Sequence, residues 1–481
     1  MSNLSDLLPS GGGQNIVDFT ASGTIASGKP VVLNANGTVS QVAAITEAVG
    51  TEANFTTGIT DYVQVVSDPD TGKTIIAYQD YADSSKGKVV VATPTASNTI
   101  SYGTPVEFSS VASYIAMTYD TGQNKVLLAY RGASNHVRAR VGTVSGTSIS
   151  FGTELVVENE TSAHIALAYD PDLGSHLVVY DYNSDRGKAR VLTVSGTDVS
   201  KGSDVQFDSS QVSQCAVAYD ESADAYLVAY RDQGNSNYGT AVVATVSGTT
   251  PSFGTAVVFE SANSIEMDAT YDSSAQKVVI TYRDLGVNQP TAIVGTVSGT
   301  SVSFGTANNI VNVNSTVGEA AYDSTNNKIV LVYRDETAEN GVYAVGTVSG
   351  TSISFATPVT FNSGQTEDTA IGFDAALGKF VIAYRDYRGS GSNTPYGTAV
   401  TLQLPSTNVS DFIGLADAAI SDTATGKINV KGSINSKQSS LTIGSDYYAQ
   451  SDGSVSTTST SPAVKIGQAV TATTINMMDL T

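Results

Sequence analysis

The chain has 481 residues and a formal net charge of −21 at pH 7, and only 14% of its residues are charged. A surface of this sign repels phosphate backbones and anionic lipids, so nucleic acid is excluded as an expected partner and membrane binding is disfavoured. No apolar run is long enough for membrane insertion, and the single cysteine, Cys215, excludes an internal disulfide framework.

The first segment, residues 1–48, is strand-like and rich in turns, as the stretch 19–42 illustrates. Val, Thr, Ser, Ala and Gly replace charged residues along the whole chain, which is typical of short strands joined by tight turns. We therefore expect a small β structure here, ahead of the repeats that follow.

A sequence repeat follows this segment and extends through most of the chain. Its marker is an aromatic residue followed by Asp at the end of a short strand, and successive marker aspartates are 50 to 52 residues apart. The first copy, Ser67-Asp68, is degenerate. The other copies are Tyr119-Asp120, Tyr169-Asp170, Tyr219-Asp220, Tyr271-Asp272, Tyr322-Asp323 and Phe373-Asp374.

Each repeat contains four short strands, as residues 263–313 illustrate. The first three cover 265–271, 277–282 and 291–297, and the fourth carries Phe304-Gly305-Thr306. The second strand is almost entirely apolar, as expected for a strand covered on both faces. Seven such repeats predict an all-β fold, a seven-bladed β-propeller of four-stranded blades. The rival interpretation, a solenoid, would leave open ends that need atypical capping repeats.

The last repeat lacks its fourth strand and departs after Leu404. The segment 49–55 matches 151–157, which belongs to a fourth strand, so residues 49–58 are expected to form the outer strand of the last blade. This composite blade would close the ring and remove an exposed sheet edge. The predicted domains are residues 1–48 and 405–481, which form the two halves of a small β attachment domain, and residues 49–404, which form the propeller.

The strand order also predicts where the flanks leave the ring. The chain would enter at the start of an outer strand, near Val49, and leave at the end of a third strand, near Leu404. Both points fall on the face where the innermost strands end. We therefore expect the attachment domain on this lower face, with the upper face free for binding.

The two flanks carry a family resemblance. Residues 3–42, with Ala-Ser-Gly-Thr-Ile-Ala-Ser-Gly-Lys-Pro-Val-Val-Leu-Asn-Ala-Asn-Gly-Thr-Val, resemble the starts of tailed-phage virion proteins, and residues 412–476 resemble the partner half. The repeats also resemble those of marine and cyanobacterial phage structural proteins. The resemblance implies a virion location, other virion proteins as partners and a homo-oligomeric assembly. It does not separate capsid decoration from a tail fibre, and it implies no catalytic residues.

Signals for catalysis are weak. The three histidines, His136, His164 and His176, are not accompanied by a nucleophile-elbow motif, and neither zinc-ligand spacing nor a phosphate-binding loop of the Walker type is present. The chain has no Trp, whereas propeller sialidases usually carry Asp-box motifs that end in Trp. We therefore expect a non-enzymatic protein without a cofactor. A carbohydrate-active enzyme stays open as an alternative.

Two acidic patterns and one recurrent motif are more typical of architecture than of a site. Asp68-Pro69-Asp70 and Asp170-Pro171-Asp172 present alternating carboxylates that suit a hard cation, but Asp is also an ordinary turn residue, so no metal site is predicted. In Tyr282-Arg283-Asp284, which recurs in most repeats, we expect Arg to pair with a carboxylate and lie on an aromatic face, fixing the following loop.

Binding is the better functional hypothesis, because the residues near the upper rim vary while their neighbours repeat. The positions six residues before each marker Asp should line the upper channel, and the loops between second and third strands are rich in Tyr, Asn, Ser and Gly, a composition suited to adaptable recognition. The alternative is that these are plain solvated loops. The candidate binding residues are Tyr62, Tyr114, His164, Gln214, Glu266, Asp368, Tyr182, Tyr238 and Tyr387.

Together these features predict a non-enzymatic phage virion surface protein. The terminal β-domain would anchor it to the particle, and the propeller would face outward to bind a host-surface glycan or receptor. The first alternative is a tail fibre or receptor-binding protein, and the second is a propeller-type carbohydrate-active enzyme.

Overall fold

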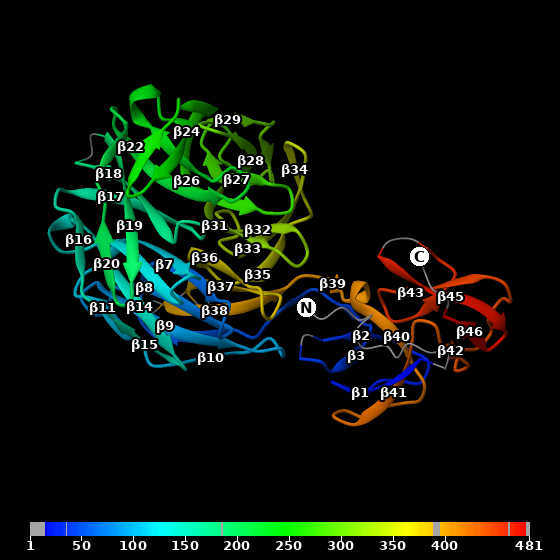
Figure 1. The fold of residues 1–481 in the computed structure, drawn as a ribbon. Coiled ribbons are helices and arrows are strands. Elements are labelled where there is room, and N and C mark those ends of the chain that lie inside the picture. The colour runs from blue at the N-terminus through cyan, green and yellow to red at the C-terminus, as the bar shows by residue number, and fades with distance from the viewer. Residues whose placement is uncertain (1–14, 35, 184–185, 388–394, 460–461, 478–481) are drawn as a thin grey trace. The chain divides into compact units, whose positions relative to one another are not determined.

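The computed structural model describes residues 15–34, 36–183, 186–387, 395–459 and 462–477. The chain divides into two compact units (Figure 1): the propeller, Ala48–Gln403, and a terminal unit formed by Met1–Glu47 and Leu404–Thr481. Within the described ranges, no helix has the length and hydropathy that a membrane span requires.

The propeller is a ring of seven antiparallel blades, which confirms the predicted fold class. The innermost strands are β7 (Thr60–Asp68), β12 (Ser113–Asp120), β17 (Ser162–Asp170), β22 (Val212–Asp220), β26 (Val257–Asp272), β31 (Ser315–Asp323) and β36 (Thr366–Asp374). The second strands are β8 (Lys73–Asp80), β13 (Lys125–Arg131), β18 (Ser175–Tyr182), β23 (Ala225–Asp232), β27 (Lys277–Asp284), β32 (Lys328–Asp335) and β37 (Lys379–Asp386). The third strands are β9 (Lys86–Pro94), β14 (Val137–Ser145), β19 (Arg186–Ser195), β24 (Tyr238–Ser247), β28 (Gln289–Ser298), β33 (Gly341–Ser349) and β38 (Tyr396–Gln403).

Each outer strand is split into two short pieces that pair with the same third strand. The split strands are β10 (Ile100–Tyr102) with β11 (Val106–Ser109), β15 (Ser148–Phe151) with β16 (Leu155–Glu158), β20 (Asp198–Lys201) with β21 (Val205–Asp208), β29 (Ser301–Phe304) with β30 (Asn308–Asn309), and β34 (Ser352–Phe355) with β35 (Val359–Asn362). In the fourth blade β25 (Thr250–Phe253) is the first piece, and the second is the beginning of β26, which continues into the fifth blade.

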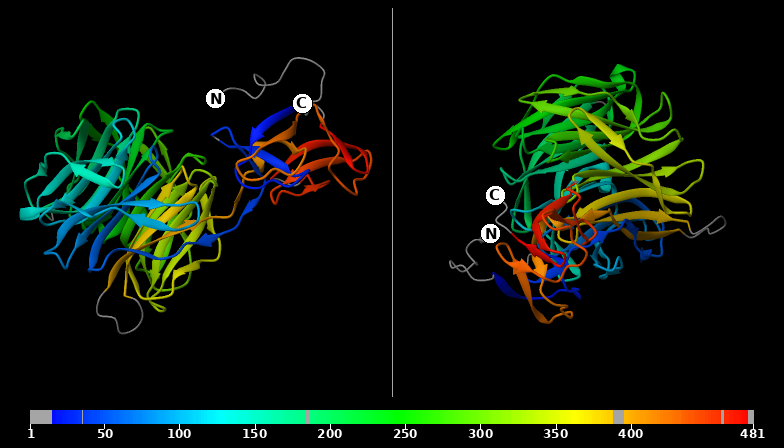
Figure 2. Two further views of the ribbon diagram at one scale, coloured as in Figure 1. Left: turned by 90° about the horizontal axis from the view of Figure 1, so that it is seen from below. Right: turned by 90° about the vertical axis from the view of Figure 1, so that its right-hand side faces the viewer.

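The outer strand of the last blade comes from the N-terminal side of the chain. β5 (Ala48–Val49) pairs with Leu402 and Gln403, and β6 (Ala53–Thr56) pairs with Gly397 to Ala399, all in β38. Figure 2 shows the blue segment that enters the ring beside the orange segment that leaves it. The composite last blade is thus confirmed, and like the other outer strands it is split rather than continuous.

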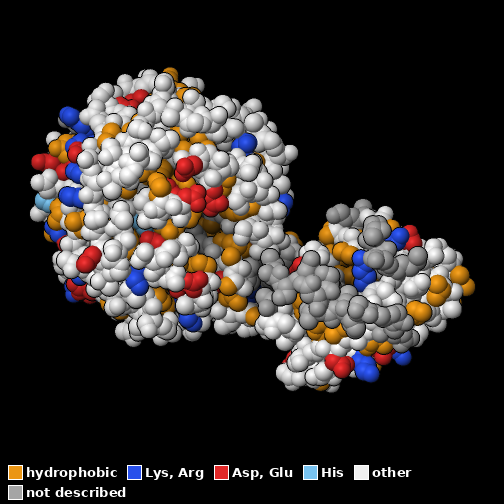
Figure 3. All heavy atoms as spheres, in the orientation of Figure 1, with side chains coloured by type: hydrophobic (Ala, Val, Ile, Leu, Met, Phe, Trp, Pro, Cys, Tyr) orange, Lys and Arg blue, Asp and Glu red, His pale blue; other side chains and the backbone are white. Residues whose placement is uncertain are grey.

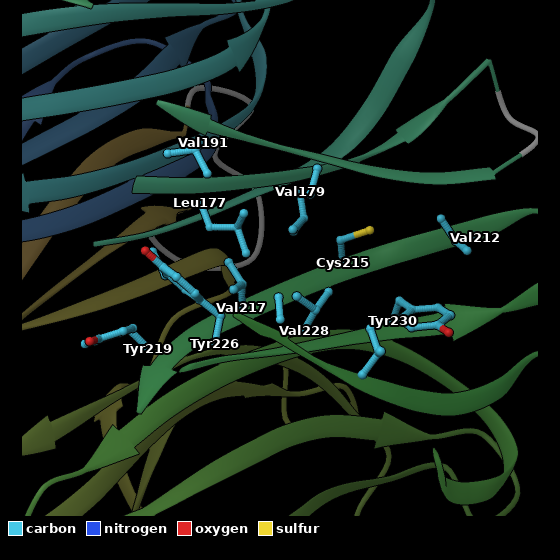
Figure 4. Close-up of a cluster of buried hydrophobic side chains, with 14 residues drawn as sticks. Leu177, Val179, Val191, Val212, Cys215, Val217, Tyr219, Tyr226, Val228 and Tyr230 are labelled. Atoms are coloured by element: carbon cyan, nitrogen blue, oxygen red, sulfur yellow. The ribbon is translucent and has the colours of Figure 1, made fainter. Parts of the chain in front are cut away.

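The second strands form the most buried layer of each blade. Seven tyrosines on these strands are between 0 and 1% exposed: Tyr78, Tyr130, Tyr180, Tyr230, Tyr282, Tyr333 and Tyr384. Apolar side chains also pack between blades. Figure 4 shows Leu177, Val179 and Val191 of the third blade against Val217 and Val228 of the fourth. The prediction that the second strands are covered on both faces is therefore confirmed.

A row of glycines brings neighbouring blades into close contact. A Cβ atom built on these residues would lie only 1.8 to 1.9 Å from the carbonyl oxygen of a Thr in the next blade's hairpin turn. The five pairs are Gly103 with Thr147, Gly152 with Thr197, Gly202 with Thr249, Gly254 with Thr300, and Gly305 with Thr351. The sixth blade has Ala356 at the equivalent position, because the seventh blade is composite and has no hairpin turn between β38 and β5.

The terminal unit contains two five-stranded sheets. Both flanks share the first sheet, whose order is β1 (Ile16–Thr20), β41 (Thr425–Val430), β40 (Phe412–Ala416), β2 (Pro30–Leu33) and β3 (Val39–Gln41). The second comes from the C-terminal flank alone and contains β42 (Ile434–Asn435), β46 (Thr474–Asn476), β45 (Ala463–Thr471), β43 (Asp446–Gln450) and β44 (Val455–Ser456). Val32, Leu415, Tyr447 and Ile466 share one core between them. The shared sheet confirms a small β-domain built from both termini.

We predict that Gly152→Ala destabilises the propeller by about 1–3 kcal/mol, because the added methyl group overlaps the Thr197 carbonyl and the blades must move apart. Ala356→Gly is the matched control, and its cost should stay below about 1 kcal/mol. Urea unfolding of both variants measures the two changes in the free energy of unfolding. Equal losses would contradict the proposed blade contact.

Candidate functional site

A cavity of about 580 Å³ lies where the innermost strands begin. All seven strands β7, β12, β17, β22, β26, β31 and β36 contribute to its wall. Figure 3 shows a hollow near the middle of the ring with acidic side chains beside it. The loops between second and third strands lie on the same face, because each second strand ends opposite the start of an innermost strand, as Asp80 does opposite Thr60.

The structure brings together six of the nine candidate residues. Tyr62, Tyr114, His164, Gln214, Glu266 and Asp368 all line the cavity. The other three are not part of its lining: Tyr182 ends a second strand, Tyr238 begins a third strand, and Tyr387 directly follows the end of β37. Tyr387 still reaches a lining residue, since its hydroxyl donates to Glu367 Oε2 at 3.3 Å. Their roles in binding stay a prediction.

A β-bulge directs each of these six side chains toward the cavity. The register of the innermost strand shifts at each position, for example between Asp61 and Gln64 in β7. The φ angles there lie between 46° and 54°, in the left-handed region: Tyr62, Tyr114, His164, Gln214, Glu266 and Asp368. A residue with a Cβ pays about 1–2 kcal/mol for this conformation, whereas Gly adopts it freely. Residues other than Gly at such strained positions therefore indicate that their side chains have a functional role.

Three aromatic side chains form an arc over the first three blades. The ring centroids of Tyr62 and Tyr114 are 5.0 Å apart, and those of Tyr114 and His164 are also 5.0 Å apart. The guanidinium of Arg131 lies 5.2 Å from the centre of the Tyr114 ring. Asp181 holds His164, with 2.9 Å between Oδ2 and Nδ1. The arc is therefore a fixed apolar surface with polar edges.

Four carboxyl groups form the opposite arc, on the fifth to seventh blades. Each accepts a hydrogen bond from a backbone N–H group of the next blade: Glu266 from Val317 (2.8 Å), Asp268 from Ala320 (2.7 Å), Glu319 from Ile371 (3.3 Å) and Asp368 from Val63 (3.1 Å). The last of these joins the seventh blade to the first. The carboxyl arc thus connects neighbouring innermost strands while it lines the cavity.

Burial in the narrow channel shifts the protonation of this carboxyl arc. It raises the pKa of Asp268 to about 6 and the pKa of Asp368 to about 7. Burial, reinforced by the charge of Asp268, raises the pKa of Glu319 well above its ordinary value. Burial also raises the pKa of Glu266, against the opposing effect of its hydrogen bond from Val317. Part of the arc is therefore protonated near neutral pH.

Two arginines of the Tyr-Arg-Asp motif also line the cavity. Arg385 binds Asp61 of the first blade and Glu367 of its own blade, and Arg334 Nη1 lies 3.1 Å from Glu367 Oε1 in the next blade. The expected Arg–carboxylate pairing is present, but it connects the innermost strands of neighbouring blades and does not fix the following loop. The following loop is instead held by the Asp of the motif, as where Asp284 accepts from the Gly286 N–H at 2.7 Å.

Two further polar groups lie where the innermost strands end. Asp170, Asp172 and Asp224 place carboxylate oxygens within 4.8 Å of one another, but Asp170 already accepts the N–H groups of Asp172 and Leu173 and caps its turn. A Thr118–His176–Asp120 chain, at 3.0 and 3.3 Å, resembles a catalytic triad in its order of contacts.

The Thr118–His176–Asp120 hydrogen bonds differ from those of a catalytic triad because a substrate has no access to them. His176 and the Asp120 side chain are completely buried, so a substrate cannot reach the imidazole. Burial also lowers the pKa of His176, which is typical of a neutral core histidine. Sequence spacing missed this contact, because the two strands that supply it belong to different blades.

We predict that Asp368→Asn removes a pH-dependent cost to stability. The folded-state pKa of Asp368 is raised to about 7, so its contribution to stability is full below its ordinary pKa of about 4 and is lost as pH rises through about 7. From pH 5 to 8 the variant should gain about 1–3 kcal/mol in unfolding free energy relative to the parent chain.

Urea unfolding at the two pH values measures this difference. Asn keeps one oxygen for the Val63 N–H and is tolerated at positive φ, so the substitution should preserve the local backbone. Asp70→Asn, at an exposed turn, is the control that should show no such gain. An Asp368→Asn variant whose stability relative to the parent does not change with pH would contradict the assignment.

Comparison with known proteins shows no family for this chain. No known protein family and no curated protein matches the sequence. Among solved structures, the Aleuria aurantia lectin is 12% identical over 64% of this chain and 98% of its own, with a TM-score of 0.43. AofleA from Arthrobotrys oligospora is 9% identical over 68% and 94%, with a TM-score of 0.41. A leech intramolecular trans-sialidase is 9% identical over 72% and 68%, with a TM-score of 0.44.

Proposed function

We propose that this chain is a non-enzymatic surface protein of a phage virion, attached to the particle by its terminal unit and binding a host-surface glycan in the propeller cavity. The observation that carries the binding proposal is the set of six side chains that line one cavity from strained, positive-φ positions. Gly would relieve the backbone strain at those positions, and among the described hydrogen bonds a backbone N–H of the next blade accounts for the side chain only at Gln214, Glu266 and Asp368.

The two arcs of the cavity suit a sugar chemically. The apolar face of a pyranose ring stacks on aromatic side chains, which the first three blades supply through Tyr62, Tyr114 and His164. Sugar hydroxyl groups need acceptors and donors, which the carboxyl arc, Gln64 and Gln214 supply. A largely preformed cavity with few convergent polar groups is also the usual form of a small-ligand site.

A carbohydrate-active enzyme is the second candidate, and one observation favours it. Asp268 and Glu319 lie on adjacent blades, interact electrostatically and have raised pKa values, as a glycosidase acid requires. Against catalysis, each carboxyl group already accepts a backbone N–H from the next blade. Release of reducing sugar from an oligosaccharide by the parent chain, abolished by Glu319→Gln, would overturn the non-enzymatic proposal.

Attachment through the terminal unit rests on its resemblance to phage virion modules and on its surface. Among the described residues, four large aliphatic side chains are exposed there: Ile45, Ile434, Ile443 and Val470, at 37, 46, 67 and 45%. Ile443 and Val470 lie close together, because the Gly444 N–H donates to the Ala469 carbonyl at 2.8 Å. We propose that this apolar pair contacts a capsid protein; the alternative is a tail fibre or another receptor-binding protein of the tail.

We predict that Tyr114→Asn weakens glycan binding at least tenfold, because it removes the central ring of the aromatic arc. Asn tolerates the φ of 46° at this position, so the fold should be retained. A glycan array followed by calorimetry measures the change. Tyr81→Asn, at a 59% exposed tyrosine outside the lining, is the matched control and should bind normally. Loss of binding in both variants, or in neither, would contradict the assigned site.

We predict that Ile443→Asp with Val470→Asp abolishes incorporation into particles while glycan binding by the free protein is unchanged. A buried charge would be unpaired at the proposed contact. Quantitative mass spectrometry of purified virions measures incorporation, and cryo-EM of the parent particle locates the chain. Density on the capsid lattice is expected, and density confined to the tail would favour the tail-fibre alternative. Normal incorporation of the double variant would exclude this surface.

A further inference from the structure

The polar lining of the cavity has a strong charge bias. Among the described residues it contains six carboxyl groups and two guanidinium groups. The carboxyl groups are Asp61, Glu266, Asp268, Glu319, Glu367 and Asp368, and the guanidinium groups are Arg334 and Arg385. A cavity with this composition attracts positive charge and repels anions, since low-dielectric walls concentrate the field of the lining.

The two arginines do not present positive charge to a ligand. Arg385 is bound by Asp61 and Glu367, and Arg334 by Glu367, Glu336 and Glu339, the latter two at 3.8 and 3.6 Å. These ion pairs also neutralise Asp61 and Glu367, so these two carboxylates are not free to bind a cationic ligand. The four carboxyl groups of the opposite arc remain. Among the described ion pairs only Glu266 has a cation, Arg283 at 3.6 Å, and the charge of Arg385 also acts on Asp368.

We propose that the ligand of this cavity carries ammonium groups beside its hydroxyl groups, as an oligosaccharide of unacetylated amino sugars does. This inference rests on the proposed glycan-binding function and specifies its ligand. An ammonium group offers three hydrogen-bond donors, and the carboxyl arc offers acceptors of which only Glu266 is paired with a cation within the described part of the chain. The aromatic arc on the opposite wall would stack on the sugar ring and also favour a cation.

The alternatives fit the lining less well. A sialylated, sulfated or uronic-acid glycan would place its own negative charge beside the ionised members of the carboxyl arc, which repel it. A neutral, acetylated glycan could stack on Tyr62 and Tyr114, but it would leave the carboxyl arc without a charged partner. The geometry therefore points to a ligand that combines a stacking face with positive charge.

Binding of an ammonium group should also release protons. Burial raises the pKa of Asp368 to about 7 and that of Asp268 to about 6, so both are partly protonated near neutral pH. Asp368 is faced by Asp61, Glu367 and Arg385, and Asp268 by Glu319. A bound cation favours the ionised carboxylates and lowers their pKa, which drives the protons into the buffer.

Isothermal titration calorimetry on the full chain tests this proposal. The probes are the tetramers of glucosamine, N-acetylglucosamine and galacturonic acid, at about pH 5.5, which is low enough to protonate most of the sugar amines. We expect the glucosamine tetramer to bind about tenfold or more tightly than the acetylated one and the galacturonate not to bind. Titrations in two buffers of different ionisation enthalpy should show proton release with the amine alone.

A charge-matched pair of variants localises the effect. Asp268→Asn should reduce the preference for the amine over the acetylated tetramer several-fold, whereas Asp70→Asn, at an exposed residue beyond the opposite ends of the innermost strands, removes the same net charge and should not. Equal binding of amine and acetylated tetramers, without proton release, overturns the ammonium proposal and leaves glycan binding standing. Failure of every glycan on an array to bind overturns the proposed function itself, and the ammonium proposal with it.

Discussion

The antiparallel pairing of β6 with β38 is the interaction on which the rest of the propeller depends. It joins Ala53 to Ala399 and Thr56 to Gly397, residues from the two ends of the ring. Without it the last blade would lack its outer strand, and an unpaired edge would be exposed. The entropic cost of closing so long a loop grows only slowly with its length. The terminal unit adds to the closure, since β1 and β41 bring the flanks together in one sheet.

Closure also creates the cavity, because it places the beginnings of seven innermost strands around one axis. A bulge in six of them turns a side chain toward that axis at positive φ. The rest of each blade has regular strands, which are packed by buried tyrosines and by glycine contacts between blades. Local backbone strain is common at preformed binding sites. The closely packed second strands stabilise the ring and so offset the strain at the six positive-φ positions.

The carboxyl arc shows the same conflict between stability and function. Its groups connect neighbouring strands by accepting backbone N–H groups, a task that a neutral amide oxygen performs equally well, as Gln214 does for Glu266. Burial makes the ionised form of these carboxyl groups costly, as the raised pKa values of Asp268 and Asp368 indicate. Four acids where amides would suffice for architecture, opposite three aromatic rings, therefore characterise this cavity as a site with a chemical preference.

The sequence by itself determined the seven blades, the composite closure and the six variable positions of the channel wall, because strand periodicity and repeat spacing are local properties of the chain. It gave no indication of the positive φ at Tyr62 or Glu266, of the stacking of Tyr114 on His164, or of the Arg385 contacts with another blade. Only the tertiary structure decided these features. The contacts join residues about fifty or more positions apart in the sequence. The φ angles and the contacts both depend on the bulge in each innermost strand and on the register of each blade, which no short sequence pattern encodes.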